Sequence, residues 1–374
     1  MKTHAIIPIF VPHYGCPHAC VFCDQKAITA RDCAPDKEET IRIIEQYLST
    51  LTTNPNVKEI EIAFFGGSFT GIPLEEQAMY LQIAKEYKDR GLVNAIHMST
   101  RPDYINDEIL DQLVKYGTDV VELGVQSFDS DVLRLSNRGH SREIVYESCE
   151  KIKARGIRLG IQLMVGLPGD SHKKCMESVR ETLKIGPEMV RIYPTVVLKN
   201  TALYRMYEMG KYKPLEEKEA VKTVSDMLRE FYAAGIEVLR VGLKSSDNIN
   251  NEEGSVGAGT YHPAFRQLAE AYMLRCDIEK ELGMMGFKDG AGEDEVCGDV
   301  VCGDGAGEGT VCGDGAGTKK TKVTIFSSPE TFSTMVGVKK SNKIYFAEKY
   351  PQISFKFAID REMEARKVRV TLQD

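Results

Sequence analysis

The sequence lacks any run of about eighteen apolar residues, so we expect no helix that spans a membrane. No secretory signal precedes its ten cysteines, which argues against a disulfide framework and predicts a reducing, cytoplasmic location. An excess of basic charge is also missing. The formal net charge of −7 predicts no broad contact with nucleic acid, although a local basic groove is compatible with that average. The 374 residues, 42% of them hydrophobic, suffice for one large domain and a small appendage.

The most informative feature is a group of three cysteines near the start of the chain. Cys16, Cys20 and Cys23 form the pattern Cys-x3-Cys-x2-Cys. Thiolates in a short loop are typical ligands of an iron–sulfur cluster, and a [4Fe–4S] cube held by three of them keeps one iron open for a substrate or cofactor. A zinc knuckle is the alternative reading, with His13 or His18 nearby as a fourth ligand.

Strand-like and helix-like segments alternate over the first two-thirds of the chain. This alternation predicts βαβ units and a parallel sheet. The expected strands are residues 5–11, 57–65, 95–99, 119–124, 157–165, 189–197 and 236–243. Polar and glycine-rich segments follow these strands, as they do on the active face of a (β/α) barrel. Seven expected strands rather than eight indicate an incomplete barrel.

The remainder of the chain divides into three parts. A long helix is expected over residues 261–282, after a flexible loop at 254–259 that we expect to fold over the open face of the barrel beside His262. Gly-rich repeats over 288–321 predict a disordered insertion. Strands at 322–326, 353–359 and 367–372 predict a small α+β cap. The expected domains are residues 1–245, 246–287, 288–321 and 322–374.

The other cysteines are weighed separately from the first three. Cys149, Cys175 and Cys276 fall in expected helices, where buried structural thiols are the ordinary outcome. The repeats carry three more cysteines with the spacing Cys-x4-Cys-x9-Cys, which arises from a degenerate repeat and does not predict a second cluster; they are Cys297, Cys302 and Cys312. Cys33 has no assigned role.

The cysteine loop, including Phe22 before its last cysteine, resembles the cluster-binding motif of the radical S-adenosylmethionine (SAM) superfamily. The resemblance implies a partial, six-stranded (β/α) TIM-type barrel, here with the α+β cap. It also implies a [4Fe–4S] cluster and SAM as cofactors. In that superfamily SAM binds the open iron, and one electron cleaves it to a 5′-deoxyadenosyl radical that abstracts hydrogen from a substrate. An electron donor such as flavodoxin or ferredoxin is therefore expected.

The same resemblance assigns roles to residues that follow the strands, and each role has a structural alternative. Gly66, Gly67 and Ser68 resemble the glycine-rich motif that holds the SAM amino group, or they form an ordinary turn. A planar guanidinium suits the SAM carboxylate, and the candidates are Arg101 and Arg138. Gln126 resembles a SAM-contacting glutamine, and the segment with Gly166 and Pro168 resembles the loop near the SAM adenine.

Three further residues are undecided from the sequence. Glu122 and Arg240 are predicted to point into the barrel, where they either contact a ligand or form structural ion pairs. His140 is either a proton donor or a loop histidine.

Several segments resemble the radical SAM half of the Elongator catalytic subunit, a tRNA-modifying protein. These segments are 65–71, 99–104, 121–127, 138–140, 166–169 and 193–212. No acetyltransferase-like segment is present, so acetyl-CoA chemistry is not expected, and Gln162 replaces a charged residue or histidine expected in related enzymes. A weaker resemblance, at 240–243, is to coproporphyrinogen oxidase-like proteins.

These resemblances leave three hypotheses. The first is radical modification of an RNA nucleobase, with tRNA as partner. The second is radical chemistry on a small molecule such as a tetrapyrrole. The third is a non-catalytic iron–sulfur binding protein.

Overall fold

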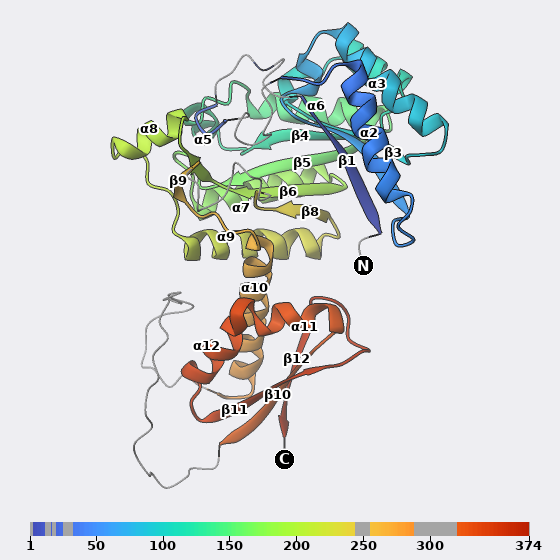
Figure 1. Cartoon of the computed structure of the whole chain (residues 1–374). Helices are drawn as coiled ribbons and strands as arrows, with labels where there is room; N and C mark the ends of the chain where they lie inside the picture. The colour runs from blue at the N-terminus through green and yellow to red at the C-terminus, as the bar shows by residue number, and fades with distance from the viewer. Residues whose placement is uncertain are drawn as a thin grey trace. The chain divides into compact units, whose positions relative to one another are not determined.

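The structure is a computed structural model that describes residues 3–11, 16, 20–24, 33–243, 255–287 and 320–373. The chain divides into two compact units, drawn in Figure 1. The first consists of Met1–Glu216 and Glu230–Pro263, and the second of Glu217–Arg229 and Ala264–Asp374. The domain limits expected from the sequence stay predictions.

A curled sheet of seven parallel strands forms the first unit, in the order β1-β2-β3-β4-β5-β6-β8 (Figure 1). The strands are β1 (His4–Val11), β2 (Glu59–Gly66), β3 (Ala95–Thr100), β4 (Val120–Gln126), β5 (Arg158–Val165), β6 (Met189–Pro194) and β8 (Glu237–Val241). Because β1 and β8 are edge strands, the sheet is an open, partial barrel. The expected α/β fold is confirmed, with seven strands in place of the six that are usual for the resembling superfamily.

Helices connect the strands of this unit. They are α2 (Lys37–Leu51), α3 (Leu74–Asp89), α4 (Asp107–Lys115), α5 (Ser130–Leu135), α6 (Arg142–Ala154), α7 (His172–Ile185), α8 (Ala202–Glu208) and α9 (Glu217–Ala233), with 3₁₀ turns η1 (Phe69–Gly71) and η2 (Pro102–Tyr104). Several begin where a short polar side chain accepts a hydrogen bond from a first-turn amide, as Asp36, Asn106, Asp129 and Ser171 do.

The two faces of the sheet differ in composition, because side chains alternate along a strand. One face is fully buried and aliphatic; it includes Ile7, Ile62, Ile96, Leu123, Ile161 and Ile192. The other, concave face carries the polar residues described below, several of them only half-buried. The carboxyl ends of the strands therefore meet a concave polar surface, as expected for a barrel that binds ligands at that end.

Residues 256–259, expected to be a flexible lid, instead form a strand. β9 (Val256–Gly259) pairs antiparallel with β7 (Val196–Leu198), the continuation of the sixth expected strand after Pro194. A Cβ on Gly257 would lie 2.4 Å from the Tyr204 ring, and Gly259 adopts φ +85°. These glycines therefore permit a close backbone approach that the sequence suggested was only flexibility. Residues 244–254 lie outside the described residues.

The second unit has its own core. It contains α10 (Phe265–Met284), β10 (Thr321–Ser327), α11 (Pro329–Val336), η3 (Val338–Lys340), α12 (Ser341–Lys349), β11 (Ile353–Ile359) and β12 (Val368–Gln373). β10 is central, parallel to β11 and antiparallel to β12. Leu274, Ile325 and Phe346 are among its buried side chains. The expected α+β cap is confirmed, and α10 begins at Phe265 rather than at residue 261.

Two other expectations concern segments that are absent from this description. The Gly-rich repeats and their three cysteines lie outside the described residues, except that Thr321 already belongs to β10. Among the described residues, no helix is both long and apolar enough to cross a membrane.

Candidate cluster and cofactor site

The cysteine loop follows β1 and is fixed to the rest of the first unit by backbone hydrogen bonds. The Val21 amide donates to the Ser136 carbonyl at 3.1 Å, and the Leu203 amide donates to the Val21 carbonyl at 2.7 Å. Phe22 packs with Val21 against a small apolar cluster that includes Leu203 and Tyr212. The loop is thus held between the end of α5 and the start of α8, at the carboxyl ends of the strands.

The three thiols lie close enough to influence one another. Cys20 is 7% exposed, and Cys16 and Cys23 are half-buried. Burial raises the pKa of the Cys23 thiol to about 12, and the neighbouring Cys20 and Cys16 add to the effect. No three His, Cys, Asp or Glu side chains in the described part of the chain gather closely enough to hold a single metal ion. The ligand assignment therefore rests on the loop sequence rather than on a preformed single-ion site.

Both candidate arginines lie beside Cys20. Arg138 donates from Nη1 to the Cys20 sulfur at 3.3 Å and from Nη2 to the Gly124 carbonyl. Arg101 uses its guanidinium fork on the Asp103 carboxylate, at 2.9 and 2.8 Å, and also donates to the Arg138 carbonyl at 2.7 Å. Their assignment to the SAM carboxylate stays a prediction, and the geometry gives Arg138 fewer carboxylate partners than Arg101.

The glycine-rich segment after β2 lies beside the start of the cysteine loop. The Gly67 amide donates to the carbonyl of Val11, the last residue of β1, at 2.7 Å. Gly66 adopts φ +109°, which a side chain would oppose. The Ser68 hydroxyl accepts from the Arg101 amide at 3.0 Å and lies 3.2 Å from the Thr100 hydroxyl. Ser68 thus joins the ends of β2 and β3, and its contact with SAM stays a prediction.

Gln126 ends β4 in an uncommon conformation. Its φ is +72°, a left-handed value that costs a non-glycine residue energy. The side chain is 9% exposed, and its Oε1 atom finds no hydrogen-bond donor among the described residues. A buried acceptor without a donor is costly, so this atom is a ready position for a ligand donor group.

The segment after β5 borders a cavity of about 230 Å³. Gly166 adopts φ +84°, its amide donates to Asp170 at 2.9 Å, and its carbonyl accepts from the Tyr212 hydroxyl at 2.6 Å. The cavity is lined by Leu135, residues 166–170, Met206, residues 211–213 and Leu215, so it includes the predicted positions Gly166 and Pro168. Their proximity to the SAM adenine stays a prediction.

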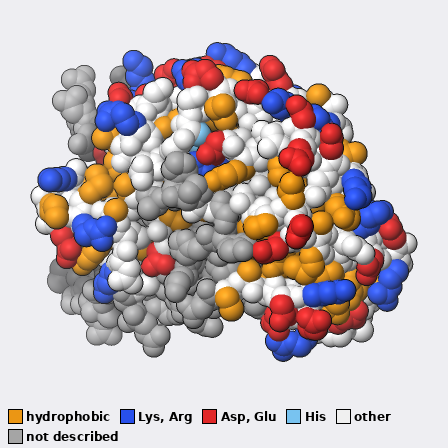
Figure 2. Space-filling view, turned by 90° about the horizontal axis from the view of Figure 1, so that it is seen from above, with side chains coloured by type: hydrophobic (Ala, Val, Ile, Leu, Met, Phe, Trp, Pro, Cys, Tyr) orange, Lys and Arg blue, Asp and Glu red, His pale blue; other side chains and the backbone are white. Residues whose placement is uncertain are grey.

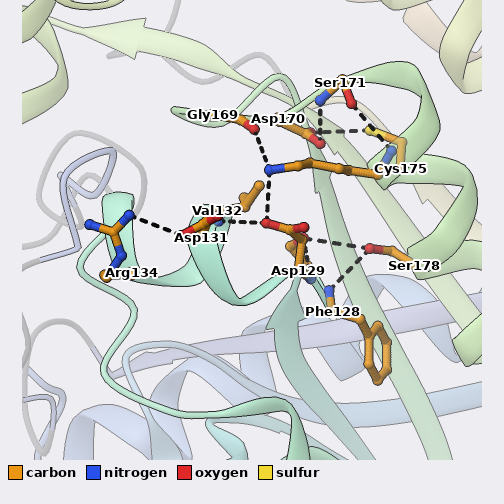
Figure 3. A network of polar contacts seen from close by, with 12 residues as sticks. Phe128, Asp129, Asp131, Val132, Arg134, Gly169, Asp170, Ser171, Cys175 and Ser178 are labelled. Carbon is orange, nitrogen blue, oxygen red and sulfur yellow. Dashed lines mark hydrogen bonds and ion pairs between the residues drawn. The ribbon is translucent and has the colours of Figure 1, made fainter.

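A polar network fixes this segment to the end of β4. Figure 3 shows Asp129, Gly169 and Asp170 converging from two loops. Lys174 of α7 donates to Asp129 Oδ1 at 3.0 Å and to the Gly169 carbonyl at 2.9 Å (Figure 3). Asp170 accepts from the Cys175 thiol at 3.1 Å, and burial raises the pKa of that carboxyl. Cys175 is thus the buried structural thiol expected from the sequence, as is Cys149.

His140 is buried beside the two arginines, and its charge state excludes one of its two expected roles. Burial, followed by the charge of Arg138, lowers the pKa of His140 to about 4. Its Nδ1–H donates to the Ser141 carbonyl at 3.3 Å, which leaves Nε2 as an acceptor. A histidine that is neutral at pH 7 with a bare Nε2 is not the proton donor considered from the sequence.

The concave face holds a group of paired charges that sequence reasoning recovered only in part. Glu122 lies 2.6 Å from His97 Nε2 and accepts a hydrogen bond from Arg191 Nε at 2.6 Å. His97 Nδ1 lies 3.2 Å from Glu61, and Gln162 donates to Glu122 at 3.1 Å. Burial opposes ionisation of Glu122, but Arg191 and His97 outweigh it and hold the pKa at about 2.

The structural reading of Glu122 is therefore correct, because every charged partner comes from another strand. His97 and Arg191 were missed. Their only sequence signal is a charged residue inside an otherwise apolar strand.

Comparison with known proteins identifies the family. Residues 10–182 match the radical SAM superfamily, and residues 187–275 match the Radical_SAM C-terminal domain. The chain belongs to the radical SAM superfamily.

Its relatives include tRNA-modifying proteins. A tRNA uridine(34) acetyltransferase of Methanocaldococcus infernus is 29% identical over 259 residues, which cover 59% of this chain and 48% of that relative. An uncharacterized protein of Methanocaldococcus jannaschii is 33% identical over 227 residues, covering 57% of this chain and 68% of the relative. The structure of the archaeal Elp3 of M. infernus with residues 1–46 deleted matches with a TM-score of 0.58 and 23% identity, covering 73% of this chain and 63% of that one, which supports the fold. The chain spans about half the length of the acetyltransferase it matches.

Radical SAM enzymes use a [4Fe–4S] cluster and SAM, and these are the cofactors of the chain. The residues present fit both groups. Three thiols in one anchored loop suit a cluster, and Arg138 supplies a positive charge beside a thiolate. The orphaned Oε1 of Gln126 suits a donor group of SAM.

Gln126→Ala is expected to weaken SAM binding by about 1.5–3 kcal/mol, the usual contribution of a hydrogen bond to a charged group. Equilibrium dialysis of anaerobically reconstituted protein measures the affinity, and iron content is expected to be unchanged. The matched control is Gln82→Ala, at an exposed position on α3. If both variants bind SAM equally well, Gln126 does not contact the cofactor.

Proposed function

We propose that the chain modifies a nucleobase in RNA, with tRNA as the substrate, by a radical reaction that begins with reductive cleavage of SAM. The cluster and SAM would supply the hydrogen-abstracting radical at the carboxyl ends of the strands. The support from relatives is that several bear the names of tRNA-modifying proteins.

The observation that carries the proposal is the composition of the concave face. Phe65, Gln162, Tyr193 and Arg240 are half-buried there. Phe65 contacts the buried polar group, with its ring centroid 5.1 Å from the Arg191 guanidinium. Tyr193 follows Arg191 by two residues and so shares its face, and Arg240 is in register with Arg191. Aromatic rings that stack on a base, with an amide that bonds to its edge, are the usual means of holding an unpaired base.

The buried charges beneath this surface have a supporting role. Glu122 and Arg191 are nearly inaccessible, at 1% and 7% exposure, and they are paired with each other. They are therefore suited to holding the strands in register rather than to binding a ligand. The half-buried residues are the ones that a base can reach, and the concave surface excludes water from the reacting atoms.

The test is an anaerobic reaction of the reconstituted protein with a reduced flavodoxin, SAM and total tRNA, followed by mass spectrometry of the nucleosides. We expect a new modified nucleoside and tRNA-dependent formation of 5′-deoxyadenosine. Tyr193→Ala is expected to lower the nucleoside product at least tenfold while tRNA-independent SAM cleavage persists. Tyr47→Ala, at an exposed position on α2, is the control. SAM cleavage that proceeds without any change in the tRNA nucleosides would refute an RNA substrate.

A further inference from the structure

The C-terminal unit carries a charge opposite to that of the whole chain. Residues 320–373 include 11 Lys and Arg but only 5 Asp and Glu, whereas the whole chain has a formal net charge of −7. On the face drawn in Figure 2, by contrast, Lys and Arg side chains are interspersed with Asp and Glu. A basic segment within an acidic chain indicates a polyanionic partner for that segment.

A tight turn joins the two helices that cover the sheet of this unit. The element order is β10, α11, a turn at residues 337–340, α12 and β11, with β10 and β11 parallel. Gly337 adopts φ +86°, and a Cβ there would lie 2.8 Å from the Asn342 amide nitrogen, so only glycine fits. Lys339 and Lys340 also have positive φ, +52° and +65°. Three left-handed residues in four are a built feature, because each non-glycine example costs energy.

The lysines of this turn project into solvent without acidic partners. Lys339, Lys340 and Lys343 are exposed, and no carboxylate lies within ion-pair distance of them among the described residues. Lys349, further along α12, is by contrast paired with Glu279 at 2.8 Å. Ile344, next to Lys343, is 52% exposed. The turn thus presents three uncompensated cations beside an apolar side chain.

We propose that this turn and the adjoining start of α12 bind the sugar–phosphate backbone of single-stranded RNA. Two helices joined by a glycine-containing turn, between two strands of one sheet, are the arrangement of KH modules, whose Gly-x-x-Gly turn clamps about four nucleotides. Here Lys340 stands where the second glycine would be and adopts the left-handed conformation that a glycine supplies. The lysines neutralise phosphates, and Ile344 offers an apolar contact to a base. The surface lies wholly within the second unit.

This inference rests on the proposed function for the choice of RNA as the partner, but it does not depend on the radical reaction. It assigns the grip on the RNA backbone to the C-terminal unit and leaves recognition of the reacting base to the barrel.

The test measures RNA binding by the full-length, cluster-loaded protein. Fluorescence anisotropy with a labelled eight-nucleotide RNA of mixed sequence is recorded over a series of KCl concentrations. The Lys339→Gln/Lys340→Gln/Lys343→Gln variant is expected to bind at least tenfold more weakly at low salt. The slope of log affinity against log salt is expected to become shallower by about 2, since each phosphate contact to a single strand contributes about 0.7.

A charge-matched control separates this surface from general electrostatic attraction. Lys320→Gln/Lys322→Gln/Lys356→Gln removes three charges from the same unit. Lys322 and Lys356 lie on the sheet face opposite the core residues Val323, Ile325 and Ile353. This control is expected to retain most of the affinity. Equal losses in the two triple variants would overturn the inference, as would equal affinity for duplex RNA or for a DNA of the same sequence.

The two proposals fail in distinguishable ways. If the turn variant loses RNA binding but the wild-type protein yields no modified nucleoside, the RNA surface stands and the proposed reaction falls. If the wild-type protein modifies tRNA and the turn variant does so with unchanged affinity, the reaction stands and the RNA surface falls.

Discussion

Cys20→Ala is expected to abolish both the iron–sulfur absorbance and SAM cleavage. Cys20 is the most buried of the three loop cysteines and the one whose sulfur contacts Arg138. A cube with only two protein thiolates loses a ligand that nothing else in the described part of the loop can replace. Iron quantification after anaerobic reconstitution, together with chromatographic assay of 5′-deoxyadenosine, measures both effects. The expected loss is about four irons per chain, the content of one [4Fe–4S] cube.

Cys149→Ala is the matched control for that experiment. Cys149 is 1% exposed within α6, and burial raises the pKa of its thiol to about 12, so it stays protonated and unreactive. The control is expected to keep its iron and its SAM cleavage. A four-iron cluster in Cys20→Ala with full SAM cleavage would show that the ligand assignment is wrong.

Glu122→Gln is expected to lower the free energy of unfolding by about 3–5 kcal/mol. The substitution keeps the side-chain shape but leaves Arg191 and His97 buried without their shared carboxylate, and an uncompensated buried charge costs about that much. Urea denaturation of the wild type and the variant measures the difference. Asp131→Asn breaks an exposed ion pair with Arg134 and is expected to cause only a small fraction of that loss.

The effect of Glu122 should also depend on pH. Its folded pKa, about 2, lies below its ordinary value of 4.5, so its contribution is fully present above pH 4.5 and is lost as the pH falls towards 2. The difference between wild type and variant should therefore shrink in that range. A difference that stays constant down to pH 2 would mean that Glu122 is not held ionised by Arg191 and His97.

How far the sequence predicted the site differs between its parts. Cys16, Cys20 and Cys23 were recognisable because cluster ligands within one loop are adjacent in the chain, so their spacing alone carries the chemistry. His97 and Arg191 were missed because they lie on different strands and pair through Glu122 of a third. A single sequence gives no information on which strands are neighbours or in which register.

The sequence by itself determined the elements and their order. Apolar alternation in the strands, helical periodicity between them and polar first-turn caps are local properties, and they fixed the α/β class and the cysteine loop. Only the tertiary structure decided which faces meet. It turned the expected lid at residues 256–259 into β9, because Val196–Leu198 offers that segment a free strand edge. It also showed the lysines of the 337–340 turn without carboxylate neighbours, because charge pairing depends on distances in space that sequence separation does not give.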